Sequence, residues 1–453
     1  MKFLLINPPI REWAQPNCFP SGLGYIAAAI ARESPDWEVE VLDVNALRLS
    51  KEQVEEYIRN ADYDLVGTSG LITIYKYNKW LIGILKKYHL DKKIIVGGSC
   101  ATSVPHIMME KNPVDILCIG EGEVTVTQLL HALSQGSPLG DVNGIWFRTD
   151  AGEIVHTPPR QPIMNLDELP HPKWELFPMD IYSTNPIGAV NVNKWVDGKQ
   201  RSDLQRKSMN LTPTRGCVYQ CTFCYHDFMG AKHRSRSPEN VVEEILALKE
   251  KYNIEYFHFT DDCFVTSRKH VMRFCDLLLK ENLNIEWGCA GRVNLMTEEL
   301  IAKMREAGCI LIGYGIESGS QKMLDSMKKR VSVEAAKNAV RLTQKYFGWA
   351  DCSFVVGLPG ETRETIQETI DFCKELNLVP EVIFFATPYP RTELYEIAMK
   401  TGKIPDEEEY ILSLGEQGEK VRINFTDFSD EELTQIKLDM VRELDAWNKI
   451  VHE

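Results

Sequence analysis

Three cysteines stand close together in the middle of the chain. They are Cys217, Cys221 and Cys224, at spacings of four and three residues. Thiolates at such spacings can ligate three irons of a [4Fe–4S] cube, which leaves the fourth iron without a protein ligand. An open iron lets a small molecule chelate the cluster and receive an electron from it. The pattern therefore predicts a catalytic cluster, because a purely structural or electron-transfer cluster normally has four cysteine ligands.

Two other interpretations of these cysteines stay open. His226 lies two residues beyond Cys224, so a structural zinc site would have a fourth ligand. Three thiols can also fall together by chance in a chain with 12 cysteines. The Gly-containing polar stretch 212–216 before the cysteines, and the aromatic Phe223 before the third one, favour a cluster loop at the end of a strand.

The Cys-x3-Cys-x-Φ-Cys motif resembles the cluster motif of the radical S-adenosylmethionine (SAM) superfamily. Four later stretches resemble its helix start and its second, fifth and sixth strands, in the family's order and spacing: Arg236–Ile245, Phe259–Asp262, Gly313–Gly319 and Phe354–Thr362. The resemblance implies that SAM chelates the open iron and is cleaved there to a 5′-deoxyadenosyl radical.

The same resemblance assigns SAM contacts to the strand ends. The candidates are Phe223, Tyr225, Thr260, Asp261, Asp262, Arg292, Glu317 and Gly357. Thr260–Asp262 is expected to hold the amino group, Arg292 the carboxylate, Glu317 the ribose hydroxyls and Gly357–Gly360 the adenine. The alternatives are turn residues for the two aspartates, a surface pair for Arg292 and a structural ion pair for Glu317. Tyr225 packs either on adenine or on the core.

The N-terminal third resembles the cobalamin-binding domain that is fused to many radical SAM enzymes. The matching stretches are Asn7–Pro9, Pro20–Tyr25, Val96–Gly98 and Gly120–Glu123. The implied cobalamin contacts are Pro8, Gly22, Leu23, Ser69, Gly70, Leu71, Thr73, Gly97, Gly98, Cys100, Gly120, Glu121, Gly122 and Glu123. Glycines at strand ends let the corrin approach the backbone closely.

One motif of many cobalamin proteins is absent from the sequence. No histidine precedes His89, and no histidine has an aspartate two residues before it, so the chain lacks Asp-x-His-x-x-Gly. We therefore expect cobalt without an imidazole ligand, either five-coordinate or bound to water. The loops Ser69–Thr73 and Gly98–Thr102 are expected against the lower corrin face. Cys100 either reaches the metal or, as is commoner for cysteine, is a packed thiol.

Strands and helices alternate in both halves of the chain. Residues 1–135 predict a doubly wound (Rossmann-like) α/β domain, whose ligands bind at the carboxyl ends of the strands. Residues 136–205 are rich in proline and predict a linker with one strand pair. Residues 206–395 predict a partial (β/α)6 barrel, and 396–453 a mostly helical extension that closes one end of the barrel.

Composition restricts the partners. The net charge of −14 on 453 residues argues against a nucleic acid. The run Lys328–Arg330 predicts a solvated helix end rather than a binding patch.

No apolar run predicts a membrane span and no signal peptide is apparent, so we expect a cytoplasmic protein. The nine other cysteines form no close pair, which predicts buried thiols rather than auxiliary clusters.

Together the two resemblances cover nearly the whole chain, which is identified as a member of the cobalamin-dependent radical SAM family (the class B methyltransferase type). This membership implies a C-methyltransferase that acts on an unactivated carbon through a 5′-deoxyadenosyl radical and methylcobalamin. The alternative is a non-methylating member that forms or contracts a ring or couples two carbons. The substrate class stays open between a small molecule, a lipid and a peptide. The reaction also needs an external one-electron reductant of the flavodoxin or ferredoxin type.

Overall fold

The computed structural model describes residues 1–11, 18–184, 206–226, 228–230, 232–415, 418 and 420–452. The chain divides into two compact units. The first unit is Met1–Asn185 with Tyr225–Gly230 and Ile404–Gly415, and the second unit is the remainder. The chain therefore crosses from one unit to the other several times.

In the described residues, the first unit is built on a seven-stranded sheet of order β2-β1-β3-β4-β5-β6-β7. The strands are β1 (Lys2–Asn7), β2 (Glu38–Asp43), β3 (Leu65–Ser69), β4 (Lys93–Gly97), β5 (Ile116–Cys118), β6 (Ile145–Arg148) and β7 (Ile154–His156). The first five run parallel, and β6 and β7 add antiparallel. Apolar side chains bury the central strands on both faces, as a parallel sheet between helices requires.

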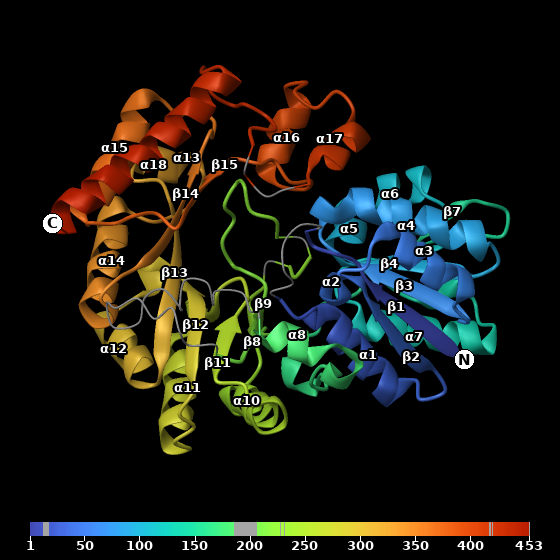
Figure 1. The fold of residues 1–453 in the computed structure, drawn as a ribbon. Coiled ribbons are helices and arrows are strands. Elements are labelled where there is room, and N and C mark those ends of the chain that lie inside the picture. Colours follow the sequence, from blue (N-terminus) through green and yellow to red (C-terminus); the bar gives the residue numbers. More distant parts are fainter. Residues whose placement is uncertain are drawn as a thin grey trace. The chain divides into compact units, whose positions relative to one another are not determined.

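Helices cover both faces of this sheet. They are α1 (Ser21–Glu33), α2 (Val44–Leu47), α3 (Lys51–Asn60), α4 (Tyr75–Tyr88), α5 (Gly98–Ser103), α6 (Pro105–Lys111), α7 (Glu123–Gln135), α8 (Met179–Thr184) and α17 (Glu407–Ser413), with short 3₁₀ turns such as η1 (Ile72–Ile74). Helices α1 and α7 pack together on one face, and α3 and α4 on the other (Figure 1). The carboxyl ends of β1, β3, β4 and β5 share one edge, where the predicted cobalamin residues lie.

Helix α17 comes from the C-terminal region and belongs to the first unit. It contacts α4 and η1, directly after β3. The Tyr75 hydroxyl donates to Glu408 Oε1 (2.7 Å), which also pairs with Lys79. His106 Nε2 lies 2.9 Å from Glu407 Oε2. These contacts fasten α17 to the elements that follow β3 and β4.

Replacing Glu408 with alanine is expected to lower the free energy of unfolding by about 1–3 kcal/mol, because the buried Tyr75 hydroxyl loses its acceptor and keeps only the Asn112 amide, which donates to it. Urea denaturation measures the change. Glu409→Ala, at an exposed position of the same helix, should alter stability by less than about 0.5 kcal/mol. Equal losses in the two variants would contradict the role given to Glu408.

The second unit contains a six-stranded parallel sheet in its described residues, of order β15-β14-β13-β12-β11-β8. The strands are β8 (Ser208–Leu211), β11 (Tyr256–Phe259), β12 (Glu286–Gly291), β13 (Cys309–Glu317), β14 (Asp351–Val356) and β15 (Val382–Phe385). Sequential parallel strands joined by helices form one curved half-barrel (Figure 1). A small antiparallel pair, β9 (Thr214–Arg215) with β10 (Arg234–Ser235), closes the base of the loop that contains the three cysteines.

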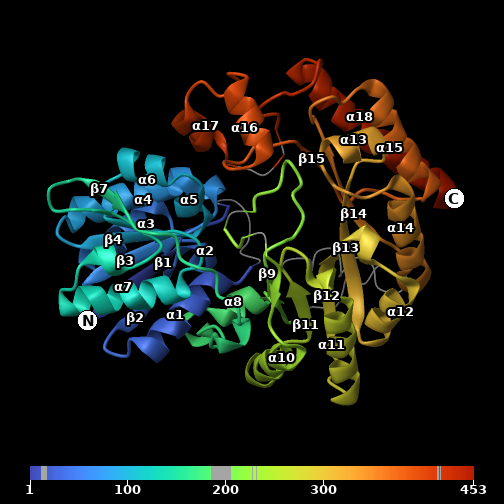
Figure 2. The same cartoon turned by 180° about the vertical axis from the view of Figure 1, so that it is seen from behind.

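Helices line the outer side of this curved sheet (Figure 2). The helices of the second unit are α10 (Pro238–Tyr252), α11 (Arg268–Lys280), α12 (Glu298–Glu306), α13 (Gln321–Ser326), α14 (Val333–Phe347), α15 (Arg363–Glu375), α16 (Glu393–Lys400) and α18 (Asp430–His452). The Ser237 hydroxyl caps α10 by accepting from the Asn240 N–H, with Pro238 as the first helical residue. Helix α18 packs on α15, and a Cβ added to Gly357 would lie 3.1 Å from Leu433 of α18.

The predicted fold class is confirmed in both halves, and the helical C-terminus with it. The four-part division of the chain stays a prediction: 185–205 of the linker lies outside the described residues, and its strand pair extends the first unit's sheet as β6 and β7. The predicted loop Gly98–Thr102 is the short helix α5. Within the described residues, no helix has the length and apolar character needed to traverse a bilayer.

Candidate functional site

The cysteine loop is fastened to the rest of the second unit at its centre. The Thr222 N–H donates to the Met327 carbonyl (3.1 Å), and the Leu394 N–H donates to the Thr222 carbonyl (2.8 Å). Phe223 packs against an apolar cluster that includes Met323 and Leu358. The loop is therefore held by backbone and apolar contacts that do not use the thiols.

The three thiols influence one another electrostatically. Cys224 has an exposed side chain, yet the protein atoms packed around its sulfur, together with the neighbouring Cys221, Asp262 and Cys217, raise its pKa to about 12. Burial also raises the pKa of Cys217. Among the described residues, no three His, Cys, Asp or Glu side chains lie close enough to hold one metal ion. A cube would present a separate iron to each thiolate. Iron must displace the protons of the thiols.

Eight of the nine other cysteines are buried, and Cys18 is partly buried. Cys100 is fully buried with its Sγ 3.7 Å from Met108 Sδ, and burial raises its pKa to about 12. This environment favours the packed-thiol interpretation of Cys100 over a cobalt ligand.

The two aspartates after β11 are joined to the start of the cysteine loop. The Thr214 hydroxyl donates to Asp261 Oδ2 (2.6 Å), and the Gly216 N–H donates to Asp262 Oδ2 (3.2 Å). Asp261 Oδ1 is buried and has no hydrogen-bond partner among the described residues. Burial raises the pKa of Asp261 to about 7. An orphaned carboxylate oxygen in a buried position calls for a ligand that donates hydrogen bonds.

Arg292 follows β12 and reaches the same loop. Its guanidinium lies 3.3 Å from the centre of the Tyr219 ring, and its Nη2 donates to the Lys329 carbonyl. Its Nε is buried without a partner in the part of the chain that the structure describes. The residue is buried, so the predicted alternative of a surface pair is wrong.

Glu317 ends β13 in a left-handed backbone conformation, with φ of 69°. Its Oε1 accepts from Lys329 Nζ at 2.7 Å, and both side chains are about nine-tenths buried. The ion pair that the sequence left open for Glu317 therefore exists. The prediction that Lys328–Arg330 forms a solvated helix end is wrong for Lys329, which is buried. Lys328 and Arg330 on either side of it are exposed.

The end of β14 is stabilised by a carboxylate that the sequence did not single out. Gly357 has φ of +91°, and its N–H donates to Glu361 Oε2. Glu361 is buried, and burial raises its pKa to about 7. A glycine is required at this turn because L-residues rarely adopt that backbone conformation.

The Glu361 carboxyl predicts a pH dependence of stability. A glutamate of the unfolded chain ionises near pH 4.5, while Glu361 in the folded chain ionises near pH 7. The unfolded state therefore loses its proton first, and stability falls as the pH rises between these values. As the pH rises from 4.5 to 8, the free energy of unfolding of Glu361→Gln should increase by roughly 3 kcal/mol relative to that of wild type. Urea denaturation at each pH measures the change. Glu368→Gln, exposed on α15, is the control, and a Glu361→Gln curve parallel to wild type would contradict the prediction.

In the first unit, the loops after β3 and β4 are in direct contact. The Cys100 N–H donates to the Gly70 carbonyl (3.0 Å), and the Ile72 N–H donates to Ser99 Oγ (3.2 Å). Gly98 has φ of +76°, and a Cβ there would lie 2.6 Å from Ser69 Oγ. Leu71 is exposed and Thr73 lies in η1. The structure thus brings the predicted residues of these two strand ends together.

The loop after β5 joins the same edge. The Gly120 N–H donates to Thr102 Oγ1 (2.9 Å) of α5, so the third loop is tied to the second. Glu121 Oε2 accepts from the Ile163 N–H (2.8 Å), and Gly122 and Glu123 begin α7.

Two glycines of this edge leave open space. A Cβ added to Gly22 would meet nothing within 4 Å, and one added to Gly120 would meet only the Phe228 carbonyl at 4.0 Å. Pro8 follows β1 directly, and Leu23 is buried in the first turn of α1. Open space at the start of α1 and after β5 fits a large ligand that must approach the backbone closely.

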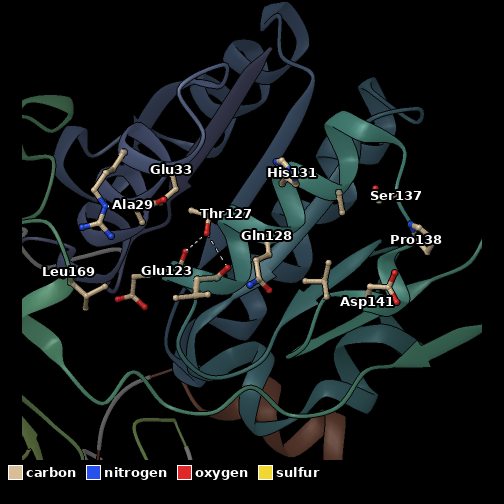
Figure 3. Close-up of a pocket in the computed structure, with 14 residues that line it drawn as sticks. Ala29, Glu33, Glu123, Thr127, Gln128, His131, Ser137, Pro138, Asp141 and Leu169 are labelled. Carbon is tan, nitrogen blue, oxygen red and sulfur yellow. Dashed lines mark hydrogen bonds and ion pairs between the residues drawn. The ribbon is translucent and has the colours of Figure 1, made fainter.

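A separate groove of about 560 Å³ lies along α1 and α7 in the first unit (Figure 3). Its lining mixes charges, with Arg32 and Glu33 on α1, and the Thr127 hydroxyl donates within α7 to the Glu123 carbonyl. Of the predicted site residues only Glu123 lines it. The groove is therefore distinct from the strand-end loops.

Comparisons with known proteins agree with this arrangement. A model of the radical SAM superfamily matches residues 211–373, and a model of the B12 binding domain matches residues 11–130. An uncharacterized methyltransferase of Pyrococcus horikoshii is 32% identical over 411 residues, covering 88% of this chain and 83% of the relative. The anaerobic magnesium-protoporphyrin IX monomethyl ester cyclase of Rubrivivax gelatinosus is 29% identical, covering 90% of this chain and 72% of the relative.

A solved structure has the same fold over most of the chain. The radical SAM methyltransferase TsrM from Kitasatospora setae, determined with cobalamin and a [4Fe–4S] cluster bound, superposes with a TM-score of 0.70 at 21% identity. The match covers 88% of this chain and 75% of TsrM.

Proposed function

This chain belongs to the cobalamin-dependent radical SAM family, and on that premise we propose that it is a C-methyltransferase acting on an unactivated carbon. The observation that carries the proposal is the combination, in one chain, of the three-cysteine loop beside a parallel half-barrel with a second sheet whose glycine-rich strand ends meet at one edge. The 32% identical relative is named a methyltransferase, which supports methyl transfer as the outcome.

The cofactors we assign are a [4Fe–4S] cluster, SAM and cobalamin. When bound, they supply a 5′-deoxyadenosyl radical that abstracts hydrogen and a methyl group for transfer to the substrate carbon. The chain's own residues would bind and orient these groups.

In the second unit, Cys217, Cys221 and Cys224 would hold three irons through their thiolates. The orphaned Oδ1 of Asp261 suits the amino group of SAM, and the orphaned Nε of Arg292 suits its carboxylate. Both polar atoms are already buried, so such a ligand would satisfy groups that now lack partners. Glu317 retains Oε2 for ribose hydroxyls, since the described contact to Lys329 uses Oε1.

We also propose further contacts to SAM and to cobalamin, most of them made by backbone groups. The amide groups near Thr260 and Gly357, together with Phe223 and Tyr225, would complete the SAM site. In the first unit, the strand-end residues from Pro8 to Glu123 would contact cobalamin, with Gly22 and Gly120 leaving room for it.

The alternative is a non-methylating reaction that forms a ring, because a cyclase is among the relatives at 29% identity. Reconstituted protein incubated with SAM, a reductant and the true substrate separates the two. Methyl transfer should yield both 5′-deoxyadenosine and S-adenosylhomocysteine. Deoxyadenosine without S-adenosylhomocysteine would exclude methyl transfer and favour the ring-forming reaction.

The reaction also needs an external one-electron donor, for which we propose a protein of the flavodoxin or ferredoxin type. The substrate stays open among small molecules, lipids and peptides, and the acidic charge of the chain disfavours a nucleic acid. The sequence lacks the histidine motif that ligates cobalt in many cobalamin proteins, so a cobalt spectrum showing nitrogen ligation would contradict this part of the proposal.

A further inference from the structure

Two adjacent lysines after α13 occupy opposite environments. Lys328 is exposed over about half of its side chain and pairs with the equally exposed Glu393. Lys329 keeps only 10% of its side chain exposed and pairs with Glu317, also 10% exposed, at 2.7 Å. Burying two charges is costly, and such a pair contributes little net stability compared with apolar residues of similar size. We therefore expect the buried pair to have a role other than stabilising the fold.

The backbone on either side places this pair beside the cysteine loop. The Met327 carbonyl accepts from the Thr222 N–H, which lies between the second and third cysteines. The Lys329 carbonyl accepts from Arg292, whose guanidinium lies over Tyr219, between the first and second cysteines. Two separate contacts thus join the segment 327–329 to the loop.

Lys329 and Glu317 hold opposite charges at buried positions in the unit that contains the three cysteines. Within a protein interior, charges interact more strongly than in water because the effective dielectric constant is lower. Charges joined to the loop through the segment 327–329 would therefore act on irons bound there.

We propose that the Lys329–Glu317 pair sets the reduction potential of the cluster held by Cys217, Cys221 and Cys224. Reduction adds one electron, supplied by the external flavodoxin- or ferredoxin-type donor, and so adds one negative charge to the cluster. The Lys329 ammonium favours that charge and the Glu317 carboxylate opposes it. Lys329 is a positioning residue in this scheme, since it acts through the cluster. The inference rests on the proposed function, because it requires the cluster.

The test is a redox titration of the reconstituted full-length chain without SAM, followed by electron paramagnetic resonance of the reduced cluster. Lys329→Met should make reduction about tenfold less favourable, equivalent to about 59 mV for a one-electron couple. Glu317→Gln should shift the equilibrium in the opposite direction. Lys328→Met, the matched exposed control, should leave it unchanged. A merely structural role would not produce shifts of opposite sign.

Two further variants control for the possibility that a single substitution disturbs folding. Lys329→Arg keeps the charge and should keep the potential. The double variant Lys329→Met with Glu317→Gln leaves no unpaired charge, and its potential should lie between those of the single variants. Equal potentials in all variants, or shifts of the same sign for Lys329→Met and Glu317→Gln, overturn the inference alone. A wild-type chain that assembles no cluster overturns both the inference and the proposed function.

Discussion

Cys221→Ala is expected to abolish SAM cleavage, with a loss of at least roughly a thousandfold, about 4 kcal/mol of activation free energy. The substitution leaves two thiolates for a cluster that needs three protein ligands here. It should not disturb the loop itself, because Thr222 and Phe223 fasten that loop by contacts that do not use the sulfur. Iron content and 5′-deoxyadenosine formation in reconstituted protein measure the outcome.

The matched control is Cys373→Ala, which removes a fully buried thiol of α15 outside the loop. It should keep the iron content and lower stability by only about 1 kcal/mol. A Cys221→Ala protein that still holds four irons and cleaves SAM would show that this thiol is not a cluster ligand.

Gly98→Ala should destabilise the first unit by about 2–5 kcal/mol and weaken cobalamin binding. The new Cβ would lie 2.6 Å from Ser69 Oγ and 2.8 Å from the Gly70 carbonyl oxygen, at a φ of +76°. Left-handed backbone costs an L-residue about 1–2 kcal/mol, and overpacking adds about 1–3 kcal/mol. Urea denaturation and titration with hydroxocobalamin measure the two effects.

The same substitution at Gly83 should act in the opposite direction. A Cβ there would meet nothing within 4 Å, and Gly83 lies inside α4, where alanine is favoured by about 0.5–1 kcal/mol. Unchanged stability and cobalamin affinity in Gly98→Ala would show that the loops after β3 and β4 can move apart without loss.

Local periodicity was sufficient to predict the regular elements that position the site. Helix α3 and strands β3 and β12 belong to the alternation predicted for residues 1–135 and 206–395, and each is specified by apolar residues close in sequence. The short helix α5 was expected as a loop. Its residues Gly98–Ser103 have too little apolar periodicity to reveal a helix that begins at a left-handed glycine.

Site features that depend on tertiary contacts were not predictable from local sequence patterns. Lys329 stands in a run of three basic residues, which is typical of a solvated surface, and only the fold reveals that Glu317 lies within reach. The carboxylate of Glu408 bonds to Tyr75, which is 333 residues away in sequence. The cysteines, by contrast, could be found because cluster ligands are short-range and chemically distinctive.

The membership of α17 in the first unit has a consequence for how the protein is made. The ribosome delivers β1 to α8 first, but Glu407–Ser413 emerges only after the whole half-barrel from β8 to β15 has been synthesised. Domains usually fold in the order of their synthesis. Here the first unit is completed only after the half-barrel has been synthesised, so until then the nascent N-terminal region keeps the surface beside η1 uncovered.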